Sequence, residues 1–117
     1  MKRAFIMLAA VLFITETART QSPEKMSYQA VIRDAGNELL SNQVIGMQIS
    51  ILQGSVSGMA VYVETHTPVT NANGLVSLEI GEGTVIGGDF SVIDWANGIY
   101  FLQTETDPTG GLNYTIK

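Results

Sequence analysis

Cysteine is absent from the 117-residue chain, which excludes disulfide bonds and a lipid-modified cysteine at the start of a mature protein. The folded part must therefore be stabilised by its hydrophobic core. Histidine is almost as rare, because the sequence contains His66 alone. A multi-histidine metal site and a Cys–His nucleophile pair are thus excluded, and we expect His66 to lie on the surface beside Glu64.

No apolar run in the sequence is long enough to cross a membrane. The longest one, Ala4 to Ile14, is about 11 residues and as a helix covers about half of a ~30 Å hydrocarbon core. We therefore predict no stable membrane span.

Two cations, Lys2 and Arg3, precede this run, and small polar residues follow it. This order is typical of a secretory signal peptide. We predict a removable signal helix over residues 1–20, cleaved before Gln21, and a short linker over residues 21–25. The protein is then expected to be exported to the periplasm, the cell surface or the extracellular space.

Basic side chains are few: 6 Lys and Arg stand against 11 Asp and Glu, for a formal net charge of -5. Without residues 1–20, three basic and ten acidic side chains remain, a net charge of -7. An acidic surface repels phosphate backbones and anionic lipids. We therefore expect no nucleic-acid partner and favour cations or basic partners.

Helical periodicity is nearly absent after residue 25, where short alternating or apolar segments rich in Val, Ile, Thr and Tyr follow one another. Turn signals such as Asp34 to Asn37 and Asn73-Gly74 separate these segments. The pattern predicts an all-β fold. We predict an antiparallel β-sandwich, Ig-like or transthyretin-like, over residues 26–117. Its strands are expected at 26–33, 43–53, 60–67, 75–80 and 99–106, with a last strand beginning at 113.

Alternation within these segments predicts which side chains form the core. On the strand 99–106 the alternative face, with Tyr100 and Leu102 inward, stays open. The predicted core residues are Met47, Ile49, Ile51, Val61, Val63, Val76, Leu78, Ile80, Ile99 and Phe101.

The last predicted strand has only begun when the sequence ends at Lys117. We therefore expect the C-terminus to be truncated. An incomplete last strand would leave an unpaired sheet edge, open to pairing with another chain and to an edge-strand oligomer.

Two segments have compositions that occur in ligand sites. Gly81 to Gly88 contains four glycines among eight residues, but it lacks the Lys-Ser/Thr ending of a phosphate-binding loop, so we predict an irregular connection and no nucleotide cofactor. Acidic residues gather near Asp34 and again between Asp89 and Asp107, at spacings that match no calcium-binding loop. A calcium site is left open, and no catalytic, cofactor or metal residues are predicted.

Aromatic residues are the remaining candidates for a binding site. Trp95, Tyr62 and Tyr100, with Tyr28 and Tyr114, would suit either a platform that stacks on sugar rings or packing between strands. Packing is the more common use of such residues.

The run Lys25 to Asp34 carries a resemblance to a known group. It reads KMSYQAVIRD, and it resembles the start of the mature chain in exported Bacteroidetes surface and tail-fibre-like proteins of uncharacterised function. The stretches GMQISIL, IDW and TETDP, with the segment Thr70 to Gly74, extend the likeness along the chain. The resemblance implies an N-terminal β-domain of a surface protein and supplies no catalytic residues.

Shorter likenesses concern the fold alone. The Asn73-Gly74 turn and the strand that follows Asn97-Gly98 are also similar to transthyretin-like and carboxypeptidase-regulatory-like sandwiches.

We accordingly predict a non-enzymatic structural or adhesive module of a secreted or surface-attached bacterial protein, with other protein chains or extracellular glycans as partners. The alternative is a carbohydrate-binding module that uses Trp95 and nearby tyrosines.

Overall fold

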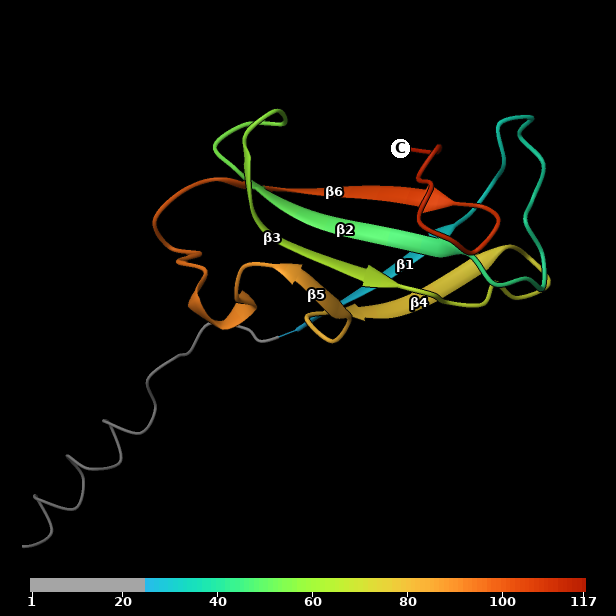
Figure 1. Ribbon diagram of the computed structural model, residues 1–117, viewed down its shortest axis with the longest axis horizontal. Coiled ribbons are helices and arrows are strands. Elements are labelled where there is room, and N and C mark those ends of the chain that lie inside the picture. The colour runs from blue at the N-terminus through green and yellow to red at the C-terminus, as the bar shows by residue number, and fades with distance from the viewer. Residues whose placement is uncertain (1–24) are drawn as a thin grey trace, which may run out of the picture.

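The computed structural model describes residues 25–117, so the predicted signal helix and most of the linker lie outside the described residues. The described part is all-β, with two antiparallel sheets and one short 3-10 helix (Figure 1). The strands are β1 Met26–Val31, β2 Gly46–Gln53, β3 Met59–His66, β4 Leu75–Ile80, β5 Thr84–Gly87 and β6 Tyr100–Asp107, and the 3-10 helix η1 is Phe90–Val92.

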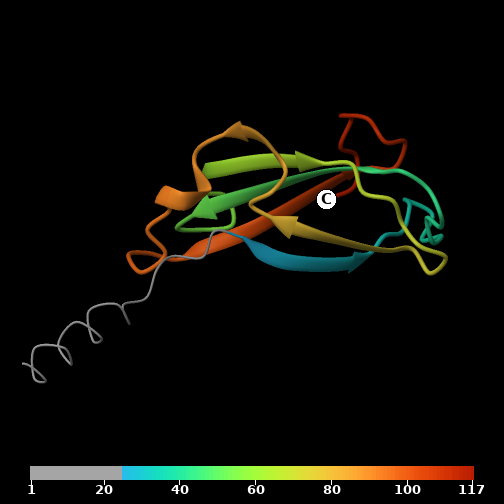
Figure 2. The same ribbon diagram turned by 90° about the horizontal axis from the view of Figure 1, so that it is seen from below.

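The two sheets form two layers, as predicted for a sandwich (Figure 2). The smaller sheet pairs β1 with β4, which are distant in sequence. The larger sheet has the order β5-β3-β2-β6, so β5 and β6 are its edges. β2 and β3 form a hairpin closed by the loop from Gly54 to Gly58, where Gly54 has a positive φ of 91°.

The core lies between the layers, and β2 contributes most to it. Met47, Ile49 and Ile51 alternate along this strand and are at most 1% exposed. Val76 and Ile80 of β4 face them, with Leu78 partly buried, so the predicted faces of β2 and β4 are confirmed. Burial of such apolar side chains contributes roughly 25 cal/mol per Å² to stability.

The predicted core face of β3 is wrong. Pairing of Ile51 with Tyr62 places Tyr62 on the core face, and Glu64 follows it there opposite Ile49. Tyr62 is 1% exposed and Glu64 is 0% exposed, whereas Val61 and Val63 are only partly buried. A buried Glu is tolerated because hydrogen-bond donors surround its carboxylate.

The predicted inward residues of β6 are also wrong. Leu102 pairs with Ile51, so the alternative face, with Tyr100 and Leu102, points toward the core side. Ile99 is 66% exposed, and Phe101 lies half-buried on the outer face of the sheet opposite Leu52.

Two further segments differ from the prediction. Gly81 to Gly88 is not wholly irregular, because β5 forms within it and pairs with β3. The predicted last strand is reduced to one bridge between Ile116 and Thr106. Within the described residues, no helix is long and apolar enough to cross a membrane.

Candidate functional site

The three aromatic residues singled out from the sequence do come together. Tyr62, Phe90, Trp95 and Tyr100 form a row in which neighbouring rings meet edge to face, with centroids 5.2, 5.7 and 5.2 Å apart. Trp95 is the third ring, and its Nε1 is buried without a hydrogen-bond partner in the described part. Phe90, which is not among the aromatic residues predicted for a site, joins Tyr62 to Trp95. The row therefore packs one end of the core, which is the more common use of such rings.

A polar cluster lies on the core face of β3. Glu64 accepts hydrogen bonds from the Tyr62 hydroxyl at 2.6 Å and from the Gly81 amide at 2.8 Å, and its other oxygen contacts His66. Burial, followed by the neighbouring Glu64 carboxylate, raises the pKa of the Tyr62 phenol above its usual value of 10.0.

His66 belongs to this cluster, so its predicted surface position is wrong. Its side chain is only 13% exposed, and its ring nitrogen contacts the Glu64 carboxylate. The signal was present in the sequence, because residues 62, 64 and 66 share one face of a strand. The hydrogen bonds of Glu64 tie β3 to the β4–β5 connection, which is a structural role.

The acidic residues considered for calcium serve as turn and cap residues. Asp34 Oδ1 accepts from the amides of Gly36 and Glu38 at 2.8 and 2.9 Å, and Asp89 Oδ1 accepts from the Ser91 amide at 3.0 Å. In residues 25–117, no three His, Asp or Glu side chains are grouped so that they would hold a metal ion.

The free edge of β6 is the most distinctive surface of the molecule. Only Thr106 is bridged on this side, by Ile116, through two backbone hydrogen bonds of 2.7 and 3.1 Å. Because antiparallel strands direct alternate residues to opposite neighbours, Thr104, Leu102 and Tyr100 also turn their N–H and C=O groups to this edge. No strand of the described part pairs with these three residues there.

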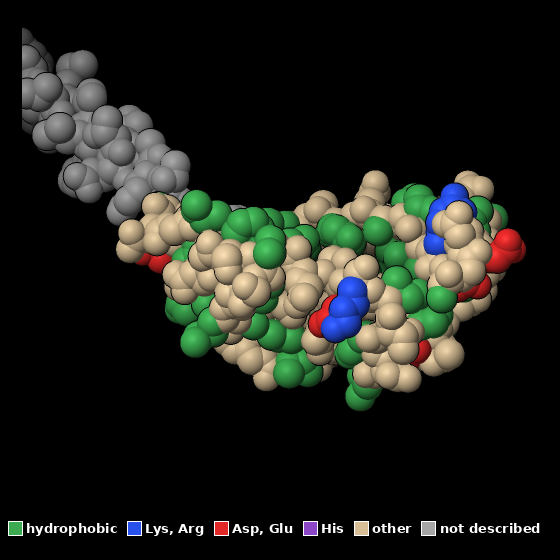
Figure 3. Space-filling view, turned by 90° about the horizontal axis from the view of Figure 1, so that it is seen from above, with side chains coloured by type: hydrophobic (Ala, Val, Ile, Leu, Met, Phe, Trp, Pro, Cys, Tyr) green, Lys and Arg blue, Asp and Glu red, His purple; other side chains and the backbone are tan. Residues whose placement is uncertain are grey.

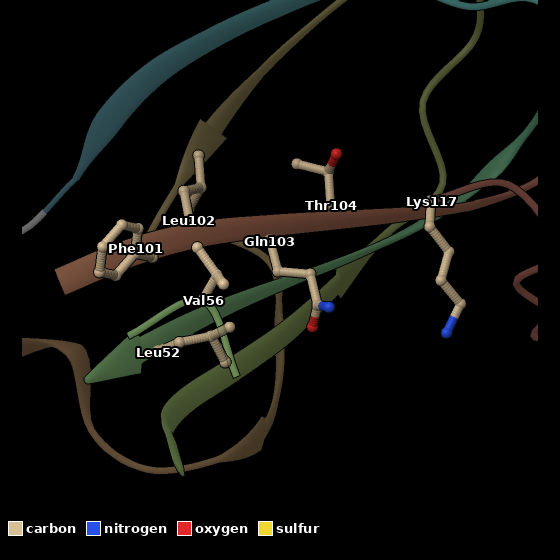
Figure 4. A pocket seen from close by; sticks show the side chains of 7 residues that line it. All are labelled: Leu52, Val56, Phe101, Leu102, Gln103, Thr104 and Lys117. Atoms are coloured by element: carbon tan, nitrogen blue, oxygen red, sulfur yellow. The ribbon is translucent and has the colours of Figure 1, made fainter. Parts of the chain in front are cut away.

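A hollow of about 360 Å³ follows this edge (Figure 4). Leu102 and Thr104 extend to the side of β6 on which β1 lies, whereas Gln103 extends to the other side. Phe101 and Leu52 line the hollow from the outer face, and Lys117 closes one end.

Two smaller hollows open between β6 and β1. The first, of about 160 Å³, has a mixed lining that includes Tyr28, Met47 and Ile116 as well as Arg33, Thr106 and Lys117. The second, of about 210 Å³, lies at the other end of β6 and is mostly apolar, with Met26, Ile51, Trp95, Tyr100, Phe101 and Leu102 in its lining. The surface on the β6 side carries few charged side chains (Figure 3). The β6 edge with these hollows is named the β6 slot below.

The family of the chain follows from its sequence match. A family model described as a domain of unknown function, DUF8740, matches residues 27–116. The chain belongs to this family. The DUF8740 match covers both sheets and reaches Ile116, so the residue that bridges the β6 edge is part of the family's domain. No curated protein and no solved structure matches the chain.

Proposed function

We propose that this DUF8740 protein is a non-enzymatic structural or adhesive module of a secreted or surface-attached bacterial protein, and that it acts by strand pairing at the β6 slot. The observation that carries the proposal is the free backbone of Tyr100, Leu102 and Thr104 beside hollows, one of which is mostly apolar. Such an edge binds an extended segment through main-chain hydrogen bonds, and pockets along it select side chains.

The finer fold type and the location are parts of the same proposal. The two-layer fold supports an Ig-like or transthyretin-like sandwich, and the order of residues in 1–20 supports export. Expression in a bacterium, followed by fractionation and mass spectrometry, tests export. We expect a product outside the cytoplasm that begins at Gln21; an uncleaved cytoplasmic product would contradict export.

A pool of ten-residue peptides of random sequence, passed over the immobilised protein, tests strand pairing. We expect the parent to retain peptides and Thr104→Pro to lose them, because proline removes the N–H at the free edge and leaves the β2 ladder intact. Thr104→Val keeps that N–H and is the matched control. Retention by neither form, or by both equally, would overturn the proposal.

Hydrogen exchange supplies a measurement that does not depend on the proline variant. In the free protein, the amides of Leu102 and Thr104 should exchange faster than those of Phe101 and Gln103, which face β2. Retained peptides should slow the first pair selectively.

A carbohydrate-binding module using Trp95 and nearby tyrosines has less support, since the Trp95 ring is partly buried against the core and packs against the rings of both Phe90 and Tyr100. Glycan-array binding by the parent that is lost in Trp95→Ala would favour this alternative. Binding that survives the substitution, or no binding, would remove it.

A further inference from the structure

We infer that Asn97 is a site of spontaneous deamidation, and that the isoaspartate formed there loosens the start of β6. The inference concerns a covalent modification and does not depend on the proposed function. It follows from the different surroundings of the two Asn-Gly pairs of the chain, Asn73-Gly74 and Asn97-Gly98.

Asparagine is a thermolabile residue, and its deamidation needs the backbone nitrogen of the next residue. That nitrogen attacks Cγ of the asparagine side chain, a C–N bond forms, and the side-chain nitrogen leaves as ammonia with the proton of the attacking amide. Water then opens the resulting cyclic imide at either of its carbonyl groups, which gives aspartate or isoaspartate. Glycine is the most permissive next residue, because it has no Cβ beside the attacking nitrogen and its backbone rotates most freely.

The first pair, Asn73-Gly74, is protected by its backbone. Gly74 is buried, its amide donates to the Asn71 carbonyl at 3.0 Å, and its carbonyl accepts from the Ile32 amide at 2.8 Å. Its φ of 76° is held in a tight space, because a Cβ there would lie 3.1 Å from Leu39 Cδ2. The Gly74 nitrogen is therefore already engaged, and its backbone has little room to rotate toward the Asn73 side chain.

The second pair lies in the exposed connection between η1 and β6. Asn97 and Gly98 are both exposed, and within residues 25–117 no backbone carbonyl accepts a hydrogen bond from the Gly98 amide. A Cβ on Gly98 would have its nearest neighbours, in Gln53 and Tyr100, only at 3.8 Å. The segment therefore has room for the rotation that the attack of the Gly98 nitrogen requires.

Isoaspartate changes the backbone as well as the charge. The chain then runs through the side-chain carbon, which adds one carbon atom to the main chain, and a carboxylate replaces the neutral amide. Before this position, the Tyr100 hydroxyl and the Asn97 amide both donate to the Asp94 carbonyl, at 2.9 and 3.1 Å. After it, the Ile99 carbonyl accepts from the Gly54 amide at 2.8 Å and ties the start of β6 to the β2–β3 hairpin. A longer backbone between Asp94 and Ile99 should weaken these bonds.

Peptide mapping by mass spectrometry tests the site. The folded protein is incubated at a series of pH values from neutral to mildly alkaline, and electron-based fragmentation distinguishes isoaspartate from aspartate. We expect conversion at Asn97 to be several-fold faster than at Asn73, and to rise with pH because base removes the amide proton of Gly98. In urea the two sites should react at similar rates, since both are then Asn-Gly pairs of an unfolded chain.

Gly98→Ala is the matched variant. It should slow conversion at Asn97 several-fold, because a methyl group then stands beside the attacking nitrogen. The denaturation midpoint should stay nearly unchanged, since a Cβ at this position makes only ordinary contacts. Conversion at Asn73 in urea should be unaffected.

Hydrogen exchange tests the effect on β6. The Gly54 amide should exchange faster in the isoaspartyl protein than in the parent. Asn97→Asp carries the new charge without the extra carbon atom, and it should keep the slow exchange. The Gly58 amide, which donates to the Ser55 carbonyl at 2.9 Å within the same hairpin loop, should be unaffected in both forms.

Three outcomes would overturn the inference. Equal conversion of Asn73 and Asn97 in the folded protein would show that the fold does not protect the first pair. Absence of conversion at Asn97 under conditions in which the unfolded chain reacts would show that the second pair is protected as well. Unchanged exchange of the Gly54 amide in the isoaspartyl protein would contradict the loosening of β6.

Discussion

The Tyr62 hydroxyl donates a hydrogen bond of 2.6 Å to the Glu64 carboxylate, and both side chains are buried on the core face of β3. The pair joins the aromatic row to the polar cluster that contains His66. Removing one partner leaves the other in the core with fewer hydrogen bonds, and an unsatisfied buried polar group lowers the stability of the fold.

Tyr62→Phe should lower the stability at neutral pH by roughly 1–3 kcal/mol. It should also flatten the alkaline loss of stability. The pKa of Tyr62 is raised in the folded state, by burial first and then by Glu64, so the unfolded chain loses this proton at lower pH than the folded one. The contribution is therefore complete below about pH 10 and is lost as pH rises further.

Urea unfolding at a series of pH values from neutral to strongly alkaline measures this effect. The parent should lose stability above pH 10 more steeply than Tyr62→Phe. Tyr28→Phe, which keeps the Tyr62–Glu64 pair intact, should retain the steep loss. Equal slopes for the parent and Tyr62→Phe would contradict the assignment.

Ile49→Asp should abolish folding or cost roughly 4 kcal/mol or more, because residue 49 is fully buried and a carboxylate there has no partner. Ile86→Asp is the same change on β5, at a side chain that is 61% exposed, and should be nearly neutral. Circular dichroism during thermal unfolding separates the two. A stable Ile49→Asp protein would show that the core does not lie on the assigned face of β2.

Gly87 and Gly88 are neighbours with opposite requirements. A Cβ on Gly88 would lie 2.2 Å from the Val61 carbonyl oxygen, and its φ is 83°, whereas a Cβ on Gly87 meets nothing within 4 Å. Gly88→Ala should therefore destabilise the protein by about 1–2 kcal/mol from the left-handed backbone alone, and more from the contact. Gly87→Ala should be neutral or slightly stabilising. Comparable denaturation midpoints would argue against the close approach of β3 to this connection.

Asp107 should control how the C-terminal segment sits on β6. Its buried carboxylate accepts from the Thr109 hydroxyl and amide at 2.7 and 2.9 Å and from the Asn113 amide at 2.9 Å. Asp107→Ala should free the segment and speed hydrogen exchange at Thr106 and Ile116. Asp94→Ala, at an exposed carboxylate, is the control. Unchanged exchange in Asp107→Ala would show that the bridge holds by itself.

The same carboxylate makes the stability of the protein depend on pH in the acid range. The hydrogen bonds from Thr109 hold the pKa of Asp107 below its usual value of 3.8. Its contribution is present above that value and is lost as pH falls through the lowered folded pKa. The free energy of unfolding of the parent should therefore fall at acid pH as this carboxylate is protonated. Asp107→Ala, which has no carboxylate there, should lack this part of the fall.

Local signals were sufficient for the elements whose two faces differ clearly. Leu75–Ile80 was predicted with its observed bounds, and Gly74, with φ of 76°, turns the chain directly before it. The apolar residues Met47, Ile49 and Ile51 defined the inner face of β2, because the residues between them include Gln48 and Ser50.

Alternation failed where both faces of a strand carry apolar residues. On β3, Val61 and Val63 compete with Tyr62, and the Glu at position 64 made the true inner face look polar. Pairing with β2 decided the matter, since the register of Ile51 with Tyr62 leaves no choice of face. Strand pairing also explains why the sequence does not predict β5. A four-residue strand among glycines forms only because β3 pairs with it.

The sequence by itself determined an all-β chain without disulfides, its turns, and the inner faces of β2 and β4, since composition and period-two alternation are local properties. Tertiary structure alone decided that the strand face shared by Glu64 and His66 is the inner face of β3, and that Tyr62, Phe90, Trp95 and Tyr100 form one row. It also decided that β6 is an edge strand whose free backbone borders hollows, one of which is mostly apolar. These features depend on which strands pair and in what register, and both are fixed by contacts between residues far apart in the chain.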